Sequence, residues 1–315
     1  MAEKTTKIQK KGVEKWPNQS APLVSVLCLV YNHKQYLRQC LDGFIMQRVN
    51  FSFEVIVHDD ASTDGSAAII NEYHERYPSL FVPILQRENQ FSRHVPITTT
   101  YMLPCARGKY IAFCEGDDYW IDPEKLQKQV DFMEAYPDYS MCIHGCRLYN
   151  NQTQEFVDNS AYMCTPDTIG ILDLFGQPFQ VASSSLFFRR NDTAEAKRLR
   201  LGDVVNVNGD TVNLFLYAEQ GKIKFLPQEM SVYRLETGLW STGNWYSRDL
   251  TSLISLSKLY SVIDNEDARC MIDNVIYPTK QGILSRMQEY YRVLGSKPYL
   301  LGQKILRPLR KLTKR

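Results

Sequence analysis

Two short acidic clusters, each placed directly after an apolar run, constrain this chain of 315 residues more than any other feature. The first cluster, at 59–65, follows the apolar run 53–57, and the second, at 115–120, follows the run 110–114. In open α/β sheets, ligands bind in the crevice outside the carboxyl ends of the strands. Because clustered carboxylates repel one another, a fold keeps them together when a cation or hydrogen-bond donors lie between them. The pattern predicts one crevice that holds a divalent metal and a phosphorylated ligand.

The composition is that of a globular protein with a sizeable core, since 44% of the residues are hydrophobic and 23% are charged. The eight cysteines are scattered, and Cys28 and Cys114 lie inside apolar runs. This favours buried thiols in a reducing compartment over a disulfide framework. The chain has no N-terminal apolar run of signal-peptide length, and no window approaches the roughly 18 apolar residues of a membrane span. We therefore expect a cytoplasmic protein.

The net charge of +2 is unevenly distributed along the chain. Residues 1–15 carry +3 and residues 297–315 carry +7, so the remainder is acidic. An acidic body argues against nucleic-acid binding, and a basic end argues for an anionic surface nearby. Apolar residues recur in the basic end at spacings of three and four, although Pro308 interrupts any single long helix. We expect peripheral attachment to the inner face of the cell membrane, and the alternative is a solvated, frayed terminus.

Strand-like and helix-like segments alternate along most of the chain. Apolar runs predict strands at 23–30, 53–57, 81–85 and 110–114, followed by weaker ones at 140–148, 181–188, 223–226 and 230–233. Helical spacing and capping residues predict helices at 36–47, 65–77, 211–220 and from 122 to about 136. From residue 246 onward the pattern is helical. This alternation predicts an α/β fold with a mainly parallel sheet flanked by helices.

Three motifs, in this order and spacing, resemble family 2 glycosyltransferases of the GT-A fold. They are Leu23–Val26 leading to Tyr31 and Asn32, the cluster at 59–65, and Glu115–Asp118. The pieces at 208–210 and 233–234 resemble the family less specifically. The resemblance implies a Rossmann-like GT-A domain over 22–245, a flexible lead-in at 1–21, and a helical extension at 246–315 that ends in the basic amphipathic tail. Bacterial capsule, exopolysaccharide and lipopolysaccharide enzymes have a similar layout.

The resemblance also implies a nucleotide-sugar site. It is formed by Tyr31, Asn32, Asp59, Asp60, Asp117 and Arg234. Asp60 matches the family position that accepts the uracil N3–H of a UDP-sugar, and an ionised carboxylate is an acceptor-only group that suits such a donor. Asp59 then shapes the turn or contacts the ribose. The alternative for this cluster is a capped helix entry, because Asp, Ser and Thr all favour that place.

The second cluster matches the family's metal motif at Asp117 and Asp118, with Glu115 in its first position. Mn²⁺ or Mg²⁺ prefers hard oxygen ligands and binds through one or two carboxylates plus substrate phosphates. The resemblance implies Asp118 as the main ligand, with Asp117 turned toward the ribose or sharing the metal. A solvated acidic turn is the alternative.

Asp210 matches the family's general base, which takes the proton from the acceptor hydroxyl during an inverting displacement. The alternative is a helix N-cap. Arg234 would clamp the diphosphate with its guanidinium fork. Many relatives carry His two residues after this arginine, where the chain has Glu236. That departure fits altered donor use or an inactive relative.

Other reaction classes fail on the same residues. A haloacid-dehalogenase-type phosphohydrolase needs Asp-x-Asp-x-Thr, but Asp59 and Asp60 are adjacent. A sugar nucleotidyltransferase or a dinucleotide oxidoreductase needs glycines after the first strand, and residues 31–34 contain none. The sequence therefore predicts an inverting, metal-dependent glycosyltransferase that moves a sugar from a nucleotide-sugar, UDP-linked or dTDP-linked, to a glycan or lipid-linked acceptor. The alternative is a non-catalytic relative that binds a nucleotide-sugar or a partner enzyme.

Overall fold

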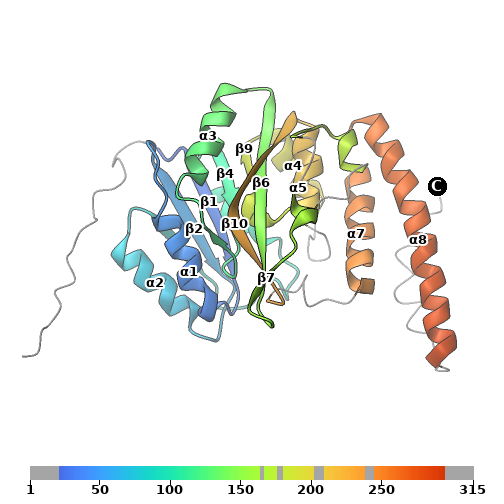
Figure 1. Ribbon diagram of the computed structural model, residues 1–315, viewed down its shortest axis with the longest axis horizontal. Helices are drawn as coiled ribbons and strands as arrows, with labels where there is room; N and C mark the ends of the chain where they lie inside the picture. Colours follow the sequence, from blue (N-terminus) through green and yellow to red (C-terminus); the bar gives the residue numbers. More distant parts are fainter. Residues whose placement is uncertain (1–20, 164–166, 176–179, 202–208, 238–244, 295–315) are drawn as a thin grey trace, which may run out of the picture.

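A computed structural model describes residues 21–163, 167–175, 180–201, 209–237 and 245–294 (Figure 1). Its first half is the parallel part of one sheet, in which the strands pair in the order β3-β2-β1-β4. These strands are β1 (Val24–Val30), β2 (Phe53–Asp59), β3 (Phe81–Leu85) and β4 (Tyr110–Phe113). β1 and β2 are buried along nearly their whole length, as expected for strands covered on both faces.

The sheet continues past β4 in the order β9-β6-β10-β5. These strands are β9 (Phe187–Arg189), β6 (Tyr139–Asn150), β10 (Lys222–Leu235) and β5 (Tyr119–Trp120), and two short strands, β7 (Glu155–Val157) and β8 (Thr168–Ile169), pair with β6 and β10. β9 is antiparallel to both β4 and β6, whereas β10 is parallel to β6. The carboxyl ends of β6 and β10 therefore lie at the same edge as those of β1, β2 and β4.

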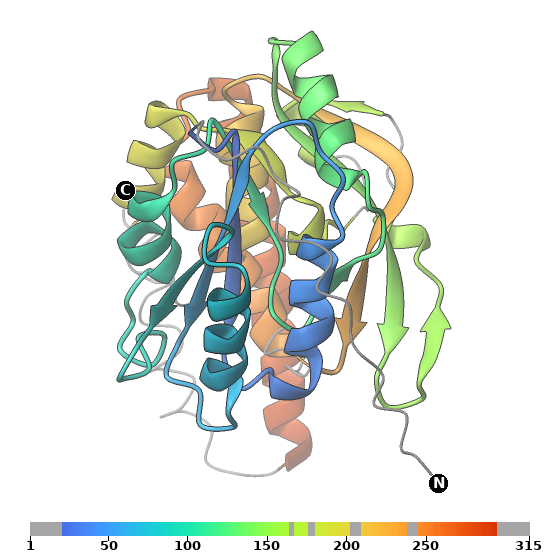
Figure 2. The same cartoon turned by 90° about the vertical axis from the view of Figure 1, so that its left-hand side faces the viewer.

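Helices cover both faces of the sheet. One face carries α1 (Lys34–Ile45), α2 (Ser66–Arg76) and α3 (Lys125–Ala135) (Figures 1 and 2). The other face carries α4 (Asp192–Arg200) and α5 (Gly209–Ala218), while α7 (Trp245–Tyr260) packs on α5 and α8 (Glu266–Leu294) packs on α7. Buried residues of α7 and of the first turns of α8 share a core with α5, so the helical extension packs on the sheet domain.

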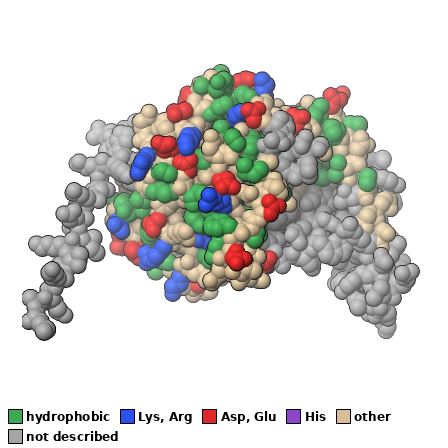
Figure 3. All heavy atoms as spheres, viewed as in Figure 1, with side chains coloured by type: hydrophobic (Ala, Val, Ile, Leu, Met, Phe, Trp, Pro, Cys, Tyr) green, Lys and Arg blue, Asp and Glu red, His purple; other side chains and the backbone are tan. Residues whose placement is uncertain are grey.

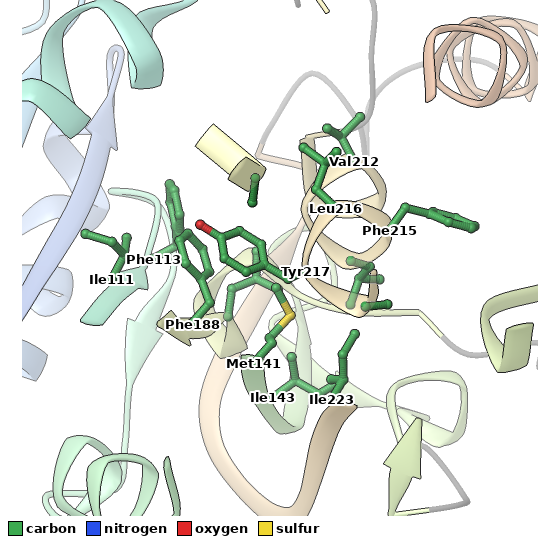
Figure 4. Packing of buried hydrophobic residues seen from close by; sticks show 14 of the residues in the cluster. Ile111, Phe113, Met141, Ile143, Phe188, Val212, Phe215, Leu216, Tyr217 and Ile223 are labelled. Carbon is green, nitrogen blue, oxygen red and sulfur yellow. The ribbon is translucent and has the colours of Figure 1, made fainter. Parts of the chain in front are cut away.

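Alternation along the strands builds two cores. On β1, Val26 and Cys28 face α1–α3, while Leu27 faces the opposite core. In that second core, the ring centroids of Phe188 and Tyr217 lie 4.1 Å apart, which joins α5 to the sheet (Figure 4). Alternating burial of this kind fixes the register of each strand, because a slip of one residue would turn its apolar set to the other face. The register in turn sets which residues reach the edge where the acidic clusters lie.

Several predicted boundaries were wrong. The predicted strand at 181–188 is instead a 3-10 turn at Ser183–Ser185 followed by the short β9, because three consecutive serines favour turns over strands. The predicted strands at 223–226 and 230–233 are one strand, β10, with register irregularities between Leu226 and Ser231. Pro227 lies in this irregular stretch, and proline is confined to bulges and edges in a sheet.

Helix starts also differ from the prediction. The helix expected to begin at Asp122 begins at Lys125, and Asp122 instead accepts the Glu124 N–H in a turn. Asp210 lies inside the first turn of α5 rather than before it, where an acidic side chain complements the helix dipole.

Cys28, Cys40, Cys114, Cys142 and Cys146 are buried free thiols, as predicted, whereas Cys105 and Cys270 are exposed free thiols. None of the described helices is long and apolar enough to cross a membrane. On the face shown in Figure 3, acidic and basic side chains are interspersed over the described surface. The lead-in and the basic tail lie outside the described residues.

Candidate functional site

The turns that follow β1 and β2 are tied together at the edge of the sheet. Asn32 Oδ1 accepts the Thr63 N–H at 2.8 Å, and the Asn32 N–H donates to Ser62 Oγ at 2.8 Å. Asn32 adopts a left-handed φ of +57°, which asparagine tolerates better than most residues. Tyr31, 48% exposed, therefore stands at the mouth of the site, while Asn32 builds its wall.

Asp59 and Asp60 end the second strand as buried carboxylates. Asp60 Oδ1 accepts the Gln90 N–H at 2.7 Å, and Oδ2 accepts the Phe91 N–H at 3.0 Å. Asp59 Oδ2 accepts the Ser62 N–H at 3.0 Å, a contact that holds the turn. Asp60 thus holds the loop at 90–91 against the sheet edge. Each of its oxygens keeps a second lone pair for a ligand, since a carboxylate has about four acceptor sites.

The second acidic cluster is packed tightly against the end of β1. A Cβ atom on Gly116 would lie 2.9 Å from Val30 Cγ2 and 2.9 Å from His33 Nδ1, so only glycine fits there. Asp117 and Asp118 follow and are buried. The close approach at Gly116 brings Asp117 Oδ2 to 3.9 Å from His33 Nε2.

Arg234, on β10, fastens this cluster from the other side. Its backbone N–H donates to Asp118 Oδ1 at 2.9 Å, and its guanidinium donates to the Asp117 carbonyl and to Gln39 Oε1. The guanidinium carbon lies 4.9 Å from the Tyr36 ring centroid and 4.5 Å from that of Tyr119. Arg234 is buried, so the arginine predicted to clamp diphosphate is engaged in shaping the acidic turn.

Two carboxylate oxygens in this cluster face no hydrogen-bond partner. They are Asp117 Oδ1 and Asp118 Oδ2, both buried and without a partner in the part of the chain that the structure describes. Burial and the nearby Asp117 raise the pKa of Asp118 well above its ordinary value. Burial, Asp117 and Asp210 together raise the pKa of Glu115 to about 8. Glu115 and Asp118 therefore favour their protonated forms, because the protein around them does not compensate their negative charge.

The acidic turn offers the carboxylate ligands that a divalent metal prefers, but the described residues supply too few of them for a site made of protein groups alone. No group of three or more His, Cys, Asp or Glu side chains among the described residues has the geometry to hold an ion. Mg²⁺ and Mn²⁺ sites of nucleotide enzymes commonly use only one or two carboxylates, with substrate phosphates as the other ligands. The unpartnered oxygens of Asp117 and Asp118 fit that arrangement.

Asp210 approaches the same cluster from α5. It lies within electrostatic reach of Glu115, whose pKa it helps to raise. Burial raises the pKa of Asp210 itself to about 7, although the cationic Arg198 acts in the opposite direction. A carboxylate with a pKa near neutrality is matched to general-base catalysis. Glu236, at the end of β10, is exposed and has a left-handed φ of +66°.

The sequence did not single out several residues that shape the site. One is His33, whose side chain is only 17% exposed and whose Nδ1 has no hydrogen-bond partner among the described residues. Gln39 and the aromatic pair Tyr36 and Tyr119, which surround Arg234, carried no motif. Gly116 did offer a signal, because a glycine between acidic residues after a strand indicates a close backbone approach.

The chain belongs to glycosyl transferase family 2, whose pattern matches residues 25–193. It is 35% identical over 224 residues to an uncharacterized protein of Mycobacterium tuberculosis, which covers 70% of this chain and 61% of that protein. It is also 31% identical over 113 residues to the Escherichia coli UDP-Glc:alpha-D-GlcNAc-diphosphoundecaprenol beta-1,3-glucosyltransferase WfaP, covering 36% of this chain and 42% of WfaP. The matched segments thus span less than two thirds of these relatives.

Two solved structures share the fold at low sequence identity. Staphylococcus aureus TarS 1-349, in complex with UDP, aligns with a TM-score of 0.61 and 17% identity, over 92% of this chain and 81% of that one. The mannosyltransferase PcManGT from Pyrobaculum calidifontis, in complex with GDP-Man and Mn²⁺, aligns with a TM-score of 0.55 and 18% identity, over 95% and 84% of the two chains. The predicted GT-A architecture, a mainly parallel sheet flanked by helices, is confirmed.

Proposed function

We propose that this protein is an inverting, metal-dependent glycosyltransferase that moves a sugar from a nucleotide-sugar, UDP-linked, to a glycan or lipid-linked acceptor. The observation that carries the proposal is the convergence of Asp117, Asp118 and Asp210 at one sheet edge in a chain of family 2. The similarity to WfaP, whose name specifies a UDP-linked donor and a lipid-diphosphate acceptor, supports both substrate classes.

The chemistry follows from the acidic side chains. Asp210, as the general base, takes the proton of the acceptor hydroxyl while that oxygen forms a bond to the anomeric carbon. The bond from the anomeric carbon to the diphosphate breaks on the opposite side, and its electron pair leaves with the diphosphate. One displacement of this kind inverts the anomeric centre. Asp117 and Asp118 would hold Mn²⁺ or Mg²⁺, which neutralises charge on the departing diphosphate.

In this proposal, the first acidic cluster, at 59–65, binds the nucleotide part of the donor. Asp60 accepts the base N3–H with the lone pairs that the loop amides leave open, and Asp59 and Asn32 keep the turn in place beside it. Tyr31 lies at the mouth of the site. Arg234 contributes to diphosphate binding indirectly, because it holds the turn that carries Asp117 in place. We assign the transferase unit to residues 22–245 and the C-terminal extension to residues 246–315.

A donor panel tests the proposed activity. The protein is incubated with UDP-, dTDP- and GDP-sugars, with Mn²⁺, Mg²⁺ or EDTA, and both the midpoint of thermal unfolding and nucleotide release are measured. A true donor binds the folded state and raises the midpoint by mass action. We expect UDP-sugars with Mn²⁺ to raise the midpoint and to release UDP. Binding without release or transfer to any acceptor would favour the non-catalytic alternative, to which the engaged Asp60 and Arg234 also lend support.

A second prediction concerns residues 297–315, which we propose to anchor the enzyme peripherally to an anionic membrane surface at the inner face. Deleting them should leave folding and UDP binding intact but reduce sedimentation with vesicles that contain anionic lipid. Each Lys or Arg near such a surface contributes about 1 kcal/mol, and salt screens the attraction. Vesicles of neutral lipid serve as the control. Equal sedimentation of the full-length and shortened proteins would show that the tail is not the anchor.

A further inference from the structure

Arg198 on α4 is a partly buried cation, one helix away from the acidic edge. Its Nη1 donates to Asn213 Oδ1 on α5, and its Nε is buried without a hydrogen-bond partner among the described residues. α4 and α5 pack side by side on the sheet (Figure 1). A guanidinium enclosed in this way is costly unless a negative charge lies close to it. The source of that charge indicates what Arg198 does.

Helix geometry places Asp210 beside Arg198. Asn213 follows Asp210 by three residues on α5, so the two side chains share one face of the helix. A helical side chain leans toward the preceding turn, so the amide of Asn213 extends over the turn that carries Asp210. The guanidinium that Asn213 holds is therefore a neighbour of the Asp210 carboxylate.

The other acids near Arg198 are already paired. Glu195, three residues earlier on α4, accepts from Arg190, with 3.1 Å between Nε and Oε1. Glu219 pairs with Lys197 instead. Glu195 and Glu219 thus have cations of their own and do not depend on Arg198 for their balance.

The electrostatics agree with this geometry. Arg198 lowers the pKa of Asp210 against the effect of burial, and Asp210 in return favours the charged form of Arg198. Among the described residues, the other titratable groups near Asp210 are the Glu115 carboxyl, just after β4, and the phenols of Tyr162, in the turn at 160–162, and Tyr233, on β10. None of these three is a cation, so the positive charge beside Asp210 comes from α4.

We propose that Arg198 is a positioning residue for sugar transfer: its guanidinium, held in place by Asn213, is the counter-charge that keeps the Asp210 carboxylate ionised. This inference rests on the proposed role of Asp210 as the general base. It also explains how a carboxylate surrounded by other acids is available to accept a proton near neutral pH.

The test is a direct titration of Asp210. The protein is labelled with aspartate carrying ¹³C in the side-chain carboxyl, and the Asp210 signal is assigned by its absence from Asp210→Asn. We expect Arg198→Gln to move the titration midpoint of this signal by about one pH unit or more toward higher pH, because a neighbouring arginine holds a carboxyl pKa down by that much. Arg198→Lys should restore most of the difference. Arg200→Gln, which removes an exposed cation from the same helix, should leave the midpoint unchanged.

An unchanged midpoint in a folded Arg198→Gln protein would overturn the inference. If that variant does not fold, Asn213→Ala removes the anchor alone, and we expect a smaller move in the same direction; no move would again overturn it. Kinetics give a second readout, because the pH profile of kcat/KM should shift with the titration. The titration needs no substrate, so it decides the role of Arg198 even if the wild-type protein transfers no sugar, a result that would count against the proposed function only.

Discussion

Replacing Asp210 with asparagine is expected to lower turnover by about 10²–10⁴-fold, the usual contribution of a positioned general base. Asparagine keeps the size of the side chain, and its amide oxygen still accepts hydrogen bonds, but it has no lone pair basic enough to take the acceptor proton. The dissociation constant for UDP should change little, because the proposed mechanism assigns nucleotide binding to the first acidic cluster and the metal. The measurement is kcat beside the UDP dissociation constant.

A matched control is Asp192→Asn. Asp192 occupies the first turn of α4 as Asp210 occupies that of α5, but it is exposed and outside the site. It should lose only a small helix-dipole interaction and keep full turnover. A near-normal rate in a folded Asp210→Asn protein would move the base role to another carboxylate, such as Glu236.

Asp210 also has a predictable effect on pH dependence. Because burial raises its pKa to about 7, the free enzyme should lose kcat/KM as the pH falls below 7, by about tenfold for each pH unit. The contribution of Asp210 to protein stability changes with pH in the opposite direction. A carboxyl group whose pKa is higher in the folded state than in the unfolded state stabilises the folded protein at low pH. This contribution is lost as the pH rises from the pKa of the unfolded state toward the folded-state value of about 7. Asp210→Asn should remove this slope from the unfolding free energy.

The sequence was sufficient for the elements whose physical signals are local. Apolar runs identified β1, β2 and β4, and the residues after them placed both acidic clusters at one edge, since parallel strands share their polarity. The order of the motifs also led to the correct family.

The sequence could not show which side chains the fold brings together over long separations. Arg234 is 117 residues from the Asp117 carbonyl that it binds, and neither Gln39 nor Tyr36 carries a signal for that contact. Similarly, the amides that occupy Asp60 come from a loop 30 residues later, and no periodicity predicts its path. The sequence predicts two strands in place of β10, because Pro227 interrupts the apolar pattern. In the structure, pairing with β6 continues on both sides of the irregularity, so the segment is one strand.

Replacing Asp118 with asparagine is expected to reduce Mn²⁺-dependent turnover by about 10²-fold or more. A neutral amide is a much weaker ligand than a carboxylate, and a metal beside a departing diphosphate supplies several kcal/mol of charge stabilisation, where each 1.36 kcal/mol corresponds to tenfold in rate. The amide oxygen can still accept the Arg234 backbone N–H, so the turn should keep its shape. Asp118→Asn should also bind UDP more weakly than the wild-type protein in the presence of Mn²⁺, whereas the two proteins should bind UDP equally in EDTA.

The same variant should be at least as stable as the wild-type protein when metal is absent. Burial and Asp117 raise the pKa of Asp118, so holding its charged form in the folded protein costs stability as the pH rises above the ordinary range of a carboxyl. Asparagine removes that cost. Thermal unfolding at pH 8 should therefore show an equal or higher midpoint for Asp118→Asn without metal, but a smaller gain than the wild type on adding Mn²⁺ and UDP. Asp122→Asn, which alters an aspartate paired with Lys128 outside the cluster, is the control and should keep the full gain. A full metal-dependent gain in Asp118→Asn would instead mean that Asp118 serves the turn alone and that Asp117 is the ligand.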